Sequence, residues 1–320
     1  MKDNIEELSE YGKSKRRSLI TGIGAIAAAS LLPLPKVFAA DGKSSAYPMI
    51  NLQDDLIIPQ LGAGTWTLTG DVATNCVKTA IETGYRLIDT AQAYGNEAAV
   101  YQGVVASKVP RNSIFITTKI SPDNMRNGTV RESIQDSLQA LGGDYIDLLL
   151  IHWPVNDKVE ETWKIMEEFV KQNKVRAIGL SNFNPHHIDE LLTYATIKPV
   201  VNQIELHPYM SQQEVVGQTF NQDIRVEAWS PLGSGQNGVL QDKVIGKIAN
   251  KYKKSIAQII LRWHIQRGVI TIPRSSNPEH IQENMNIFDF TLSPVDMSII
   301  NGLNKNERWN PKNDPDSFPW

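Results

Sequence analysis

The stretch GYRLIDTAQAYGNE, residues 84–97, ends a short apolar run on a carboxylate and places a tyrosine five residues later. Leu87 and Ile88 predict a buried strand that stops at Asp89, and Tyr94 follows in a turn rich in small residues. An aspartate often begins a turn, and a tyrosine often fills a rim. Whether the two belong to a site depends on the residues that end the other strands.

Short apolar runs alternate with amphipathic segments from residue 49 onward. The runs that predict strands are residues 60–64, 86–89, 114–118, 146–151, 175–180, 200–204, 225–229 and 269–272. The segments that predict helices include residues 71–83, 96–107, 129–141, 158–173, 185–195, 211–221, 240–252 and 255–267. Strand–helix alternation predicts a parallel sheet, and eight units over about 250 residues have the size of an α/β (β/α)8 TIM barrel. The last two helices both fall between the final pair of strands, so we expect two extra helices.

A doubly wound sheet is the rival fold, and it would carry a glycine-rich first strand–helix turn. The first junction, GAGTWTLTGD (62–71), lacks that pattern. A G-x-G-x-x-G motif does occur at Gly233, Gly235 and Gly238, but it follows the seventh strand and no helix opens on it. We therefore reject the dinucleotide-binding sheet. A glycine loop in this place is where such barrels often hold phosphate.

The two ends of the barrel sequence carry additional segments. PMINLQDDLIIPQ (48–60) predicts an N-terminal β-hairpin that turns at residues 53–55 and plugs the bottom of the barrel. The tail, residues 306–320, is rich in proline, asparagine and aromatic residues and has no helical period. It is either a flap on the substrate side that orders on contact or a disordered end. Residues 40–320 are expected to form a single domain and, because a barrel closes its own edges, a monomer.

The composition excludes several classes of protein. The 320 residues carry a formal net charge of −3, without the basic excess that nucleic-acid binding requires. Cys76 is the only cysteine, so internal disulfides and a cysteine-based zinc site are ruled out. No set of metal ligands is visible, and we expect no metal.

The N-terminus predicts export. Lys13, Lys15, Arg16 and Arg17 precede the uncharged run at 19–34, and this pattern is typical of a secretory signal peptide. The adjacent arginines resemble a bacterial twin-arginine signal, which implies the twin-arginine export machinery as a partner, only transient membrane contact, and a periplasmic location. Small residues predict cleavage after Ala39, so residues 1–39 form the signal. An uncleaved membrane anchor is the alternative.

Four polar residues come from three successive strand ends. Asp89 ends the second strand, with Tyr94 just beyond it; Lys119 ends the third, and His152 follows the fourth. Strand ends converge on one face of a barrel, which predicts one site. A phenol there can donate a proton, with Asp89 keeping Lys119 charged and Lys119 lowering the tyrosine pKa by about 3 units, or roughly 4 kcal/mol. His152 would orient a carbonyl oxygen that becomes an alkoxide. The adjacent histidines His186 and His187 are expected to face solvent.

Seven blocks together resemble the aldo-keto reductases, in order: GYRLIDTAQAYGNE, ITTKI, IHWP, GLSNF, NQIELHP, EAWSPLG and IPRSSNPEHIQENMNIFDF. The resemblance covers residues 49–305 and implies a TIM barrel that reduces carbonyls with NADPH. It assigns Tyr94 as the general acid, Lys119 and Asp89 as groups that tune it, and His152 as the residue that orients substrate.

The same resemblance implies a cofactor site. Ser181, Asn182 and Gln203 would hold the nicotinamide carboxamide, Trp229 would stack on the ring, and the rest would meet the phosphates and adenine: Gly64, Thr65, Ser230, Pro231, Leu232, Gly233, Ser234, Pro273, Arg274, Ser275, Ser276, Asn277, His280, Glu283 and Asn284. Two positions depart from the family pattern. Arg274 replaces the usual lysine, and His280 replaces a second cation. NADP(H) is favoured, and NAD(H) stays an alternative.

Trp66, Trp153 and Trp309 are expected to form the walls of the substrate pocket, although rim packing explains Trp309 equally well. An apolar, aromatic pocket suits a small-molecule carbonyl: small aldehydes, dicarbonyls or keto-sugars. The blocks most resemble the bacterial branch of diketo-gluconate and methylglyoxal reductases. Outside the cytoplasm reduced nicotinamide is scarce, so two alternatives stay open. One is a cofactor-loaded binding or sensor barrel with little turnover. The other is an oxidoreductase that regenerates its own bound cofactor.

Overall fold

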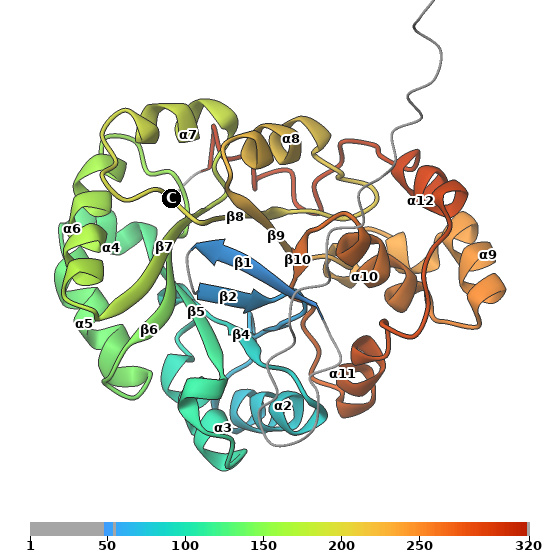
Figure 1. Cartoon of the computed structure of the whole chain (residues 1–320), viewed down its shortest axis with the longest axis horizontal. Helices are drawn as coiled ribbons and strands as arrows, with labels where there is room; N and C mark the ends of the chain where they lie inside the picture. The colour runs from blue at the N-terminus through green and yellow to red at the C-terminus, as the bar shows by residue number, and fades with distance from the viewer. Residues whose placement is uncertain (1–47, 54–55, 319–320) are drawn as a thin grey trace, which may run out of the picture. The chain divides into compact units, whose positions relative to one another are not determined.

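Eight parallel strands form the sheet of the computed structural model, which describes residues 48–53 and 56–318. Neighbours in the sheet are neighbours in the chain: β3 (Ala63–Gly64), β4 (Leu87–Asp89), β5 (Phe115–Ile120), β6 (Ile146–Ile151), β7 (Val175–Ser181), β8 (Val201–Glu205), β9 (Arg225–Trp229) and β10 (Ile270–Thr271). The ring closes beside β3, where Leu61 bridges Thr271 in parallel and the Gly62 N–H donates to the Thr271 carbonyl at 2.9 Å. The predicted (β/α)8 barrel is confirmed (Figure 1).

Helices surround the strands, as Figure 1 shows. The predicted ones are α2 (Gly70–Thr83), α3 (Glu97–Ala106), α5 (Val130–Ala140), α6 (Val159–Lys171), α7 (Pro185–Leu192), α8 (Gln213–Asn221), α9 (Lys243–Tyr252) and α10 (Ile256–Gln266). The last two both lie between β9 and β10, as expected. Short helices outside the predicted segments are α4 (Pro122–Asn127), α11 (Pro278–Met285) and α12 (Pro294–Asn301). In the described part of the chain, no helix is long and apolar enough to cross a membrane.

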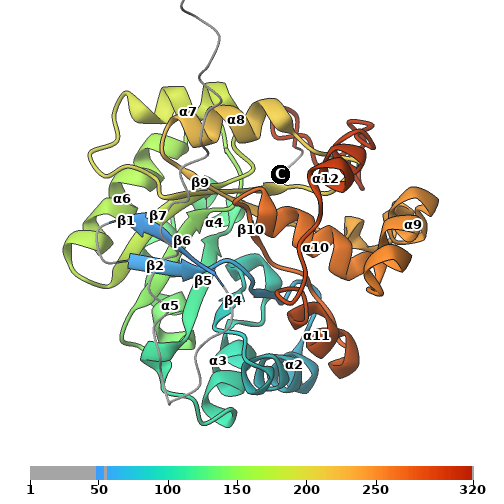
Figure 2. The same ribbon diagram turned by 45° about the vertical axis from the view of Figure 1, so that its right-hand side comes forward.

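An antiparallel hairpin, β1 (Met49–Gln53) and β2 (Leu56–Pro59), lies across the ring of strands in both views (Figure 1 and Figure 2). Leu52, Leu56 and Ile58 pack with apolar side chains inside the barrel, including Leu87 and Phe115 at the strand starts. Ile58 is fully buried, which stabilises the fold by about 1.5–3 kcal/mol. The hairpin therefore closes the amino-terminal end, as predicted, and leaves the carboxyl-terminal end for a site.

Polar side chains are concentrated at that second end. The barrel interior near the hairpin contains apolar residues such as Leu148, Leu150 and Val201. One layer nearer the strand ends, the buried residues include Lys119 and Glu227. Burying a charged group costs free energy unless it is paired, so we expect these side chains to have partners within the layer.

Candidate active site

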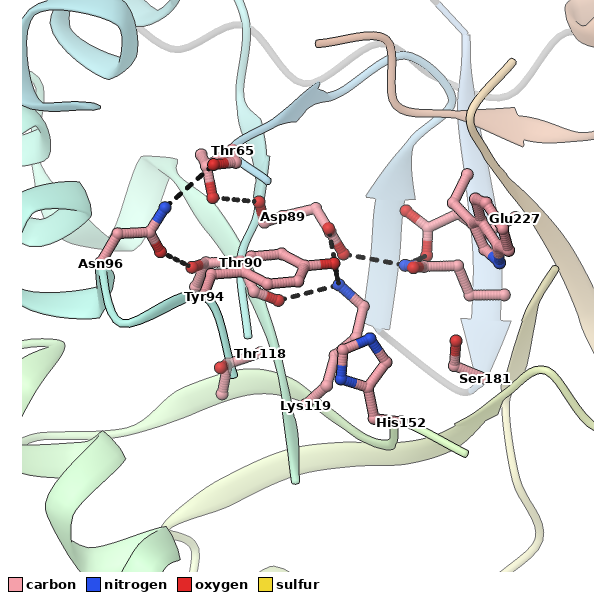
Figure 3. A network of polar contacts seen from close by, with 12 residues as sticks. Thr65, Asp89, Thr90, Tyr94, Asn96, Thr118, Lys119, His152, Ser181 and Glu227 are labelled. Carbon is pink, nitrogen blue, oxygen red and sulfur yellow. Dashed lines mark hydrogen bonds and ion pairs between the residues drawn. The ribbon is translucent and has the colours of Figure 1, made fainter. Parts of the chain in front are cut away.

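The site centres on a buried lysine that joins two strand ends. Lys119, with no exposed surface, donates to Asp89 Oδ1 at 2.6 Å, to the Thr90 carbonyl at 2.8 Å and to the Tyr94 hydroxyl at 3.3 Å. Figure 3 shows these side chains converging. The structure thus brings together the acid, the ammonium and the phenol that the sequence placed on successive strands.

A network of hydrogen bonds fixes the turn that carries Tyr94. The tyrosine ends a 3-10 turn, η1 (Gln92–Tyr94), which Gly95 terminates with φ of 64°. Buried Asn96 donates to the carbonyls of Thr65 at 2.9 Å and Leu68 at 2.8 Å, and accepts from Thr90 at 2.6 Å. Every polar atom of the Asn96 amide is used, so the phenol is held by a rigid loop.

Burial raises the pKa of Tyr94, because desolvation of the phenolate outweighs the attraction of Lys119. The expectation that Lys119 lowers this pKa below its usual value is wrong. The reason is that Asp89 and burial oppose the lysine. Burial works against the charge of Lys119 as well, but Asp89 and Tyr94 raise the pKa of the ammonium overall, so it stays charged.

His152 faces the same place. Its ring lies edge-on to Tyr94 with the two centroids 5.7 Å apart. Burial, followed by the charge of Lys119, lowers the histidine pKa well below its usual value, so the imidazole is neutral. Its Nδ1 has no hydrogen-bond partner among the described residues. A neutral imidazole has one N–H to donate, and beside the phenol it can bind the same oxygen.

Tyr94 and His152 line one end of a cavity of about 1070 Å³. Its wall includes most residues expected at the cofactor: Gly64, Ser181, Asn182, Gln203, Trp229, Ser230, Pro231, Leu232, Ser234, Pro273, Arg274, Ser275, Ser276, Asn277, His280, Glu283 and Asn284. Thr65 and Gly233 do not line it. The Thr65 hydroxyl instead donates to the Asp89 carbonyl at 2.9 Å, and buried Gly233 shapes the turn after β9 with φ of 61°.

The middle of this wall complements a primary amide. Asn182 Nδ2 donates to Ser181 Oγ at 3.1 Å and to the His152 carbonyl at 3.0 Å, while its Oδ1 accepts from Trp229 Nε1 at 2.8 Å. The Ser181 hydroxyl therefore keeps its proton for a ligand. Gln203 contributes a carbonyl oxygen for which the described chain shows no donor. One donor and one acceptor match the two polar atoms of a carboxamide.

The far end of the cavity is built for an anion. Arg274 follows β10 and donates through Nε to the Trp66 carbonyl at 3.2 Å and through Nη2 to the Thr67 hydroxyl, crossing the cavity wall. Asn277 caps α11 by accepting from the Glu279 N–H at 2.9 Å. A helix N-terminus beside a guanidinium suits a phosphate.

Residues of the C-terminal tail line the cavity. The backbone N–H of Trp309 donates to buried Glu205 at 2.7 Å, and the indole ring centroid lies 5.8 Å from that of Trp66. Phe318 stacks on Trp153 at 3.7 Å. All four aromatic rings line the cavity, so Trp309 belongs to its wall. Asn310, Asn313 and Phe318, also in the wall, were not predicted individually, although the tail's aromatic composition indicated contact.

His186 and His187 also contact the tail. Their Nε2 atoms lie 3.3 and 3.4 Å from Asp316 Oδ1. The expectation of a solvent role is wrong for His187, whose side chain is only 14% exposed. The three residues are spaced like metal ligands, but His187 Nδ1 accepts the Asn184 N–H at 3.1 Å. In the neutral ring its Nε2 then carries the proton and points at Asp316, which leaves no lone pair for a metal.

Comparison with known proteins agrees with this geometry. Residues 60–305 match the profile of the "Aldo/keto reductase family". The chain belongs to this family. Glyoxal reductase of Bacillus subtilis is 46% identical over 272 residues, covering 85% of this chain and 98% of the relative. Methylglyoxal reductase DkgA of Escherichia coli is 42% identical, covering 84% and 98%.

Solved aldo-keto reductases share the fold. That of Bombyx mori, determined in complex with NADP, is 38% identical with a TM-score of 0.79, covering 85% of this chain and 98% of its own. That of Brucella melitensis is 42% identical with a TM-score of 0.77, covering 80% and 99%. Enzymes of this family reduce aldehydes and ketones mainly with NADPH, so this aldo-keto reductase is an oxidoreductase of that type.

Proposed function

We propose that this enzyme reduces small aldehydes and α-dicarbonyls of the methylglyoxal type with NADPH, using Tyr94 as the proton donor. The observation that carries the proposal is the contact of the Tyr94 hydroxyl with a buried, charged lysine, beside a neutral histidine, in the wall of a large cavity. Relatives named for glyoxal and methylglyoxal support a small dicarbonyl substrate. Trp66, Trp153 and Trp309 line the cavity, and such an aromatic wall suits a small or flat substrate.

NADPH, when bound, supplies the hydride. The residues of this chain perform the remaining tasks. Tyr94 and the N–H of His152 donate hydrogen bonds to the substrate oxygen, which polarises the carbonyl. As negative charge develops on that oxygen, Tyr94 transfers its proton, and Lys119 stabilises the phenolate that remains. An alkoxide is a much stronger base than a phenolate, so a phenol with a raised pKa still donates its proton readily.

The residues that would hold the cofactor are those that line the cavity. Ser181 and Gln203 would bind the carboxamide, Trp229 would support the ring, and Arg274 would pair with a phosphate. His280 is a weaker second cation than arginine, so we propose a preference for NADPH over NADH that is moderate rather than absolute.

The test is the consumption of NADPH or NADH by purified residues 40–320 with methylglyoxal and with an aromatic aldehyde. We expect turnover with methylglyoxal and a higher kcat/KM with NADPH. His280→Arg should increase the NADPH preference and Arg274→Met should reduce it. Tight binding of both nucleotides without turnover would contradict the reductase and favour the cofactor-loaded binding barrel.

We also propose that the protein is exported folded to the periplasm through its twin-arginine signal. Residues 1–39 lie outside the described part of the chain, and the proposal rests on Arg16, Arg17 and the apolar run after them. Cell fractionation should find the native chain in the periplasm, lacking residues 1–39, and Arg16→Lys/Arg17→Lys in the cytoplasm. A native chain that stays in the membrane at full length would favour the anchor.

A further inference from the structure

A second buried carboxyl group lies beside the proposed proton donor and has no part in the mechanism above. Glu227, on β9, has no exposed surface and lies in register with Gln203 of β8. Gln203 Nε2 donates to Glu227 Oε2 at 3.1 Å and to Asp89 Oδ2 at 2.8 Å. Figure 3 shows Glu227 and Asp89 on either side of this contact. The sequence analysis did not identify Glu227, because a glutamate within a strand predicts a solvent-exposed side chain.

Two carboxyl groups that share one amide fix its orientation. An Nε2 group has two N–H bonds, and here each has an acceptor. If the amide turned over, its carbonyl oxygen would face the Asp89 carboxylate and repel it. The Gln203 carbonyl oxygen is therefore directed away from both acids, and Gln203 lines the cavity.

We propose that Glu227 is a positioning residue, which acts through Gln203 by holding its amide so that the carbonyl oxygen accepts the carboxamide N–H of the nicotinamide. This inference rests on the proposed function, since it requires a nicotinamide in the cavity. It adds a buried acid, on a strand that carries none of the catalytic side chains, to the machinery that orients the cofactor.

The charge balance of the layer is consistent with this task. Asp89 and Lys119 form one ion pair. Burial, followed by the charge of Asp89, raises the pKa of Glu227 to about 8. A neutral Glu227 still offers an acceptor oxygen to Gln203 and adds no second negative charge. The titratable groups that act on it are Asp89 from β4 and Lys119 from β5; β10 presents apolar Ile270 in register.

The experiment uses two oxidised cofactors that differ only in the group at issue. NADP⁺ has a carboxamide, whereas its 3-acetylpyridine analogue keeps the carbonyl but lacks the N–H. Dissociation constants are measured by calorimetry for the wild type, Glu227→Leu and Glu227→Gln. Ile270→Val serves as the control, because it disturbs packing beside Glu227 without touching Gln203.

Glu227→Leu should weaken NADP⁺ binding about tenfold and leave the analogue within about twofold, because one Gln203 N–H loses its acceptor and the amide can tilt while it keeps its bond to Asp89. Glu227→Gln keeps an acceptor and should restore NADP⁺ affinity. If Glu227→Leu lost equal affinity for the two cofactors, or lost none for either, the inference would be overturned. The proposed function would still stand, provided that the wild type binds NADP⁺. A wild type that binds no NADP⁺ would overturn the proposed function as well.

The pH dependence provides a second readout. Above pH about 8, an ionised Glu227 should favour the positively charged oxidised ring over the neutral reduced one. The ratio of the NADPH to the NADP⁺ dissociation constant should therefore rise between pH 7 and 9 in the wild type. In Glu227→Gln it should stay constant, and the same rise in this variant would contradict the assignment.

Discussion

At the residue scale, the phenol of Tyr94 is the group whose protonation decides the direction of the reaction. Burial raises its pKa above the usual value near 10, and Lys119 only partly opposes this effect. Reduction requires the phenol and oxidation requires the phenolate. A raised pKa therefore keeps the enzyme in the form that donates a proton at neutral pH.

The raised pKa of Tyr94 predicts how the rates of reduction and oxidation depend on pH. Reduction should be level from neutral pH to about 10 and fall above it, whereas alcohol oxidation should increase through the same range. His152 is already neutral because its pKa is lowered, so no loss is expected until the pH is well below 6.5. The measurement is kcat against pH in the Glu227→Gln variant, which removes the second titration. A fall in reduction near pH 7 would contradict the raised tyrosine pKa.

The buried Asp89–Lys119 pair predicts a strong effect on stability. Lys119→Met leaves the Asp89 carboxylate buried without its cation, which should reduce the free energy of unfolding by about 3–5 kcal/mol. Asp89→Asn/Lys119→Met should recover much of that loss, because the uncompensated charge is gone. Denaturation by urea compares the three proteins. If Lys119→Met had the same free energy of unfolding as the wild type, the ion pair would not be desolvated.

Most of the site could be predicted at this scale, because each catalytic side chain directly ends a strand or follows one. Glu227 could not, since RVEAW contains no signal that separates an exposed glutamate from a buried one. Its inward position follows only from the pairing of β8 with β9, which places Glu227 in register with Gln203. The sign of the Tyr94 shift also required the structure, because burial cannot be counted from sequence.

At the element scale, contacts from three separate parts of the barrel hold the tail beside the cavity. Glu205 at the end of β8 accepts the backbone N–H of Trp309, and Trp153 stacks on Phe318. Near the start of α7, Asn184 Nδ2 donates to Asp316 at 2.9 Å. Its role as a substrate-side flap stays a prediction. The short helices α4, α11 and α12 were missed because they lie outside the strand–helix alternation that predicted the others.

The tail predicts a change in substrate binding. Trp309→Ala removes an aromatic wall but leaves the proton donor intact, so KM for an aromatic aldehyde should increase about tenfold while kcat changes little. Asp316→Asn, far from the Trp309 contact, is the matched control and should alter KM less. Steady-state kinetics with both variants test this prediction. An unchanged KM in Trp309→Ala would show that the tail does not contact substrate.

At the scale of the whole molecule, the residues that stabilise the barrel and the residues of the candidate active site lie at opposite ends. The hairpin and apolar interior close one end, and the polar layer opens at the other. The eight strands were predictable because each is an apolar run flanked by amphipathic helices, whereas closure beside Leu61 depends on contacts between residues 210 positions apart.

Cofactor binding should stabilise the entire barrel, because the cavity joins residues from β3 to the tail. At 100 times the dissociation constant, NADPH should add about 2.7 kcal/mol to the free energy of unfolding, equivalent to an increase in Tm of roughly 5–10 °C. Differential scanning fluorimetry measures it, and size-exclusion chromatography with light scattering tests for the expected monomer. No thermal shift with saturating NADPH would contradict the cofactor site.

The most direct test of the central claim is single-turnover reduction of methylglyoxal by NADPH-loaded Tyr94→Phe. We predict that the rate falls about 10²–10⁴-fold while the NADPH dissociation constant stays within about twofold of the wild type, because only the proton donor is lost. A variant that reduces methylglyoxal at the native rate would contradict the assignment of Tyr94 as the acid.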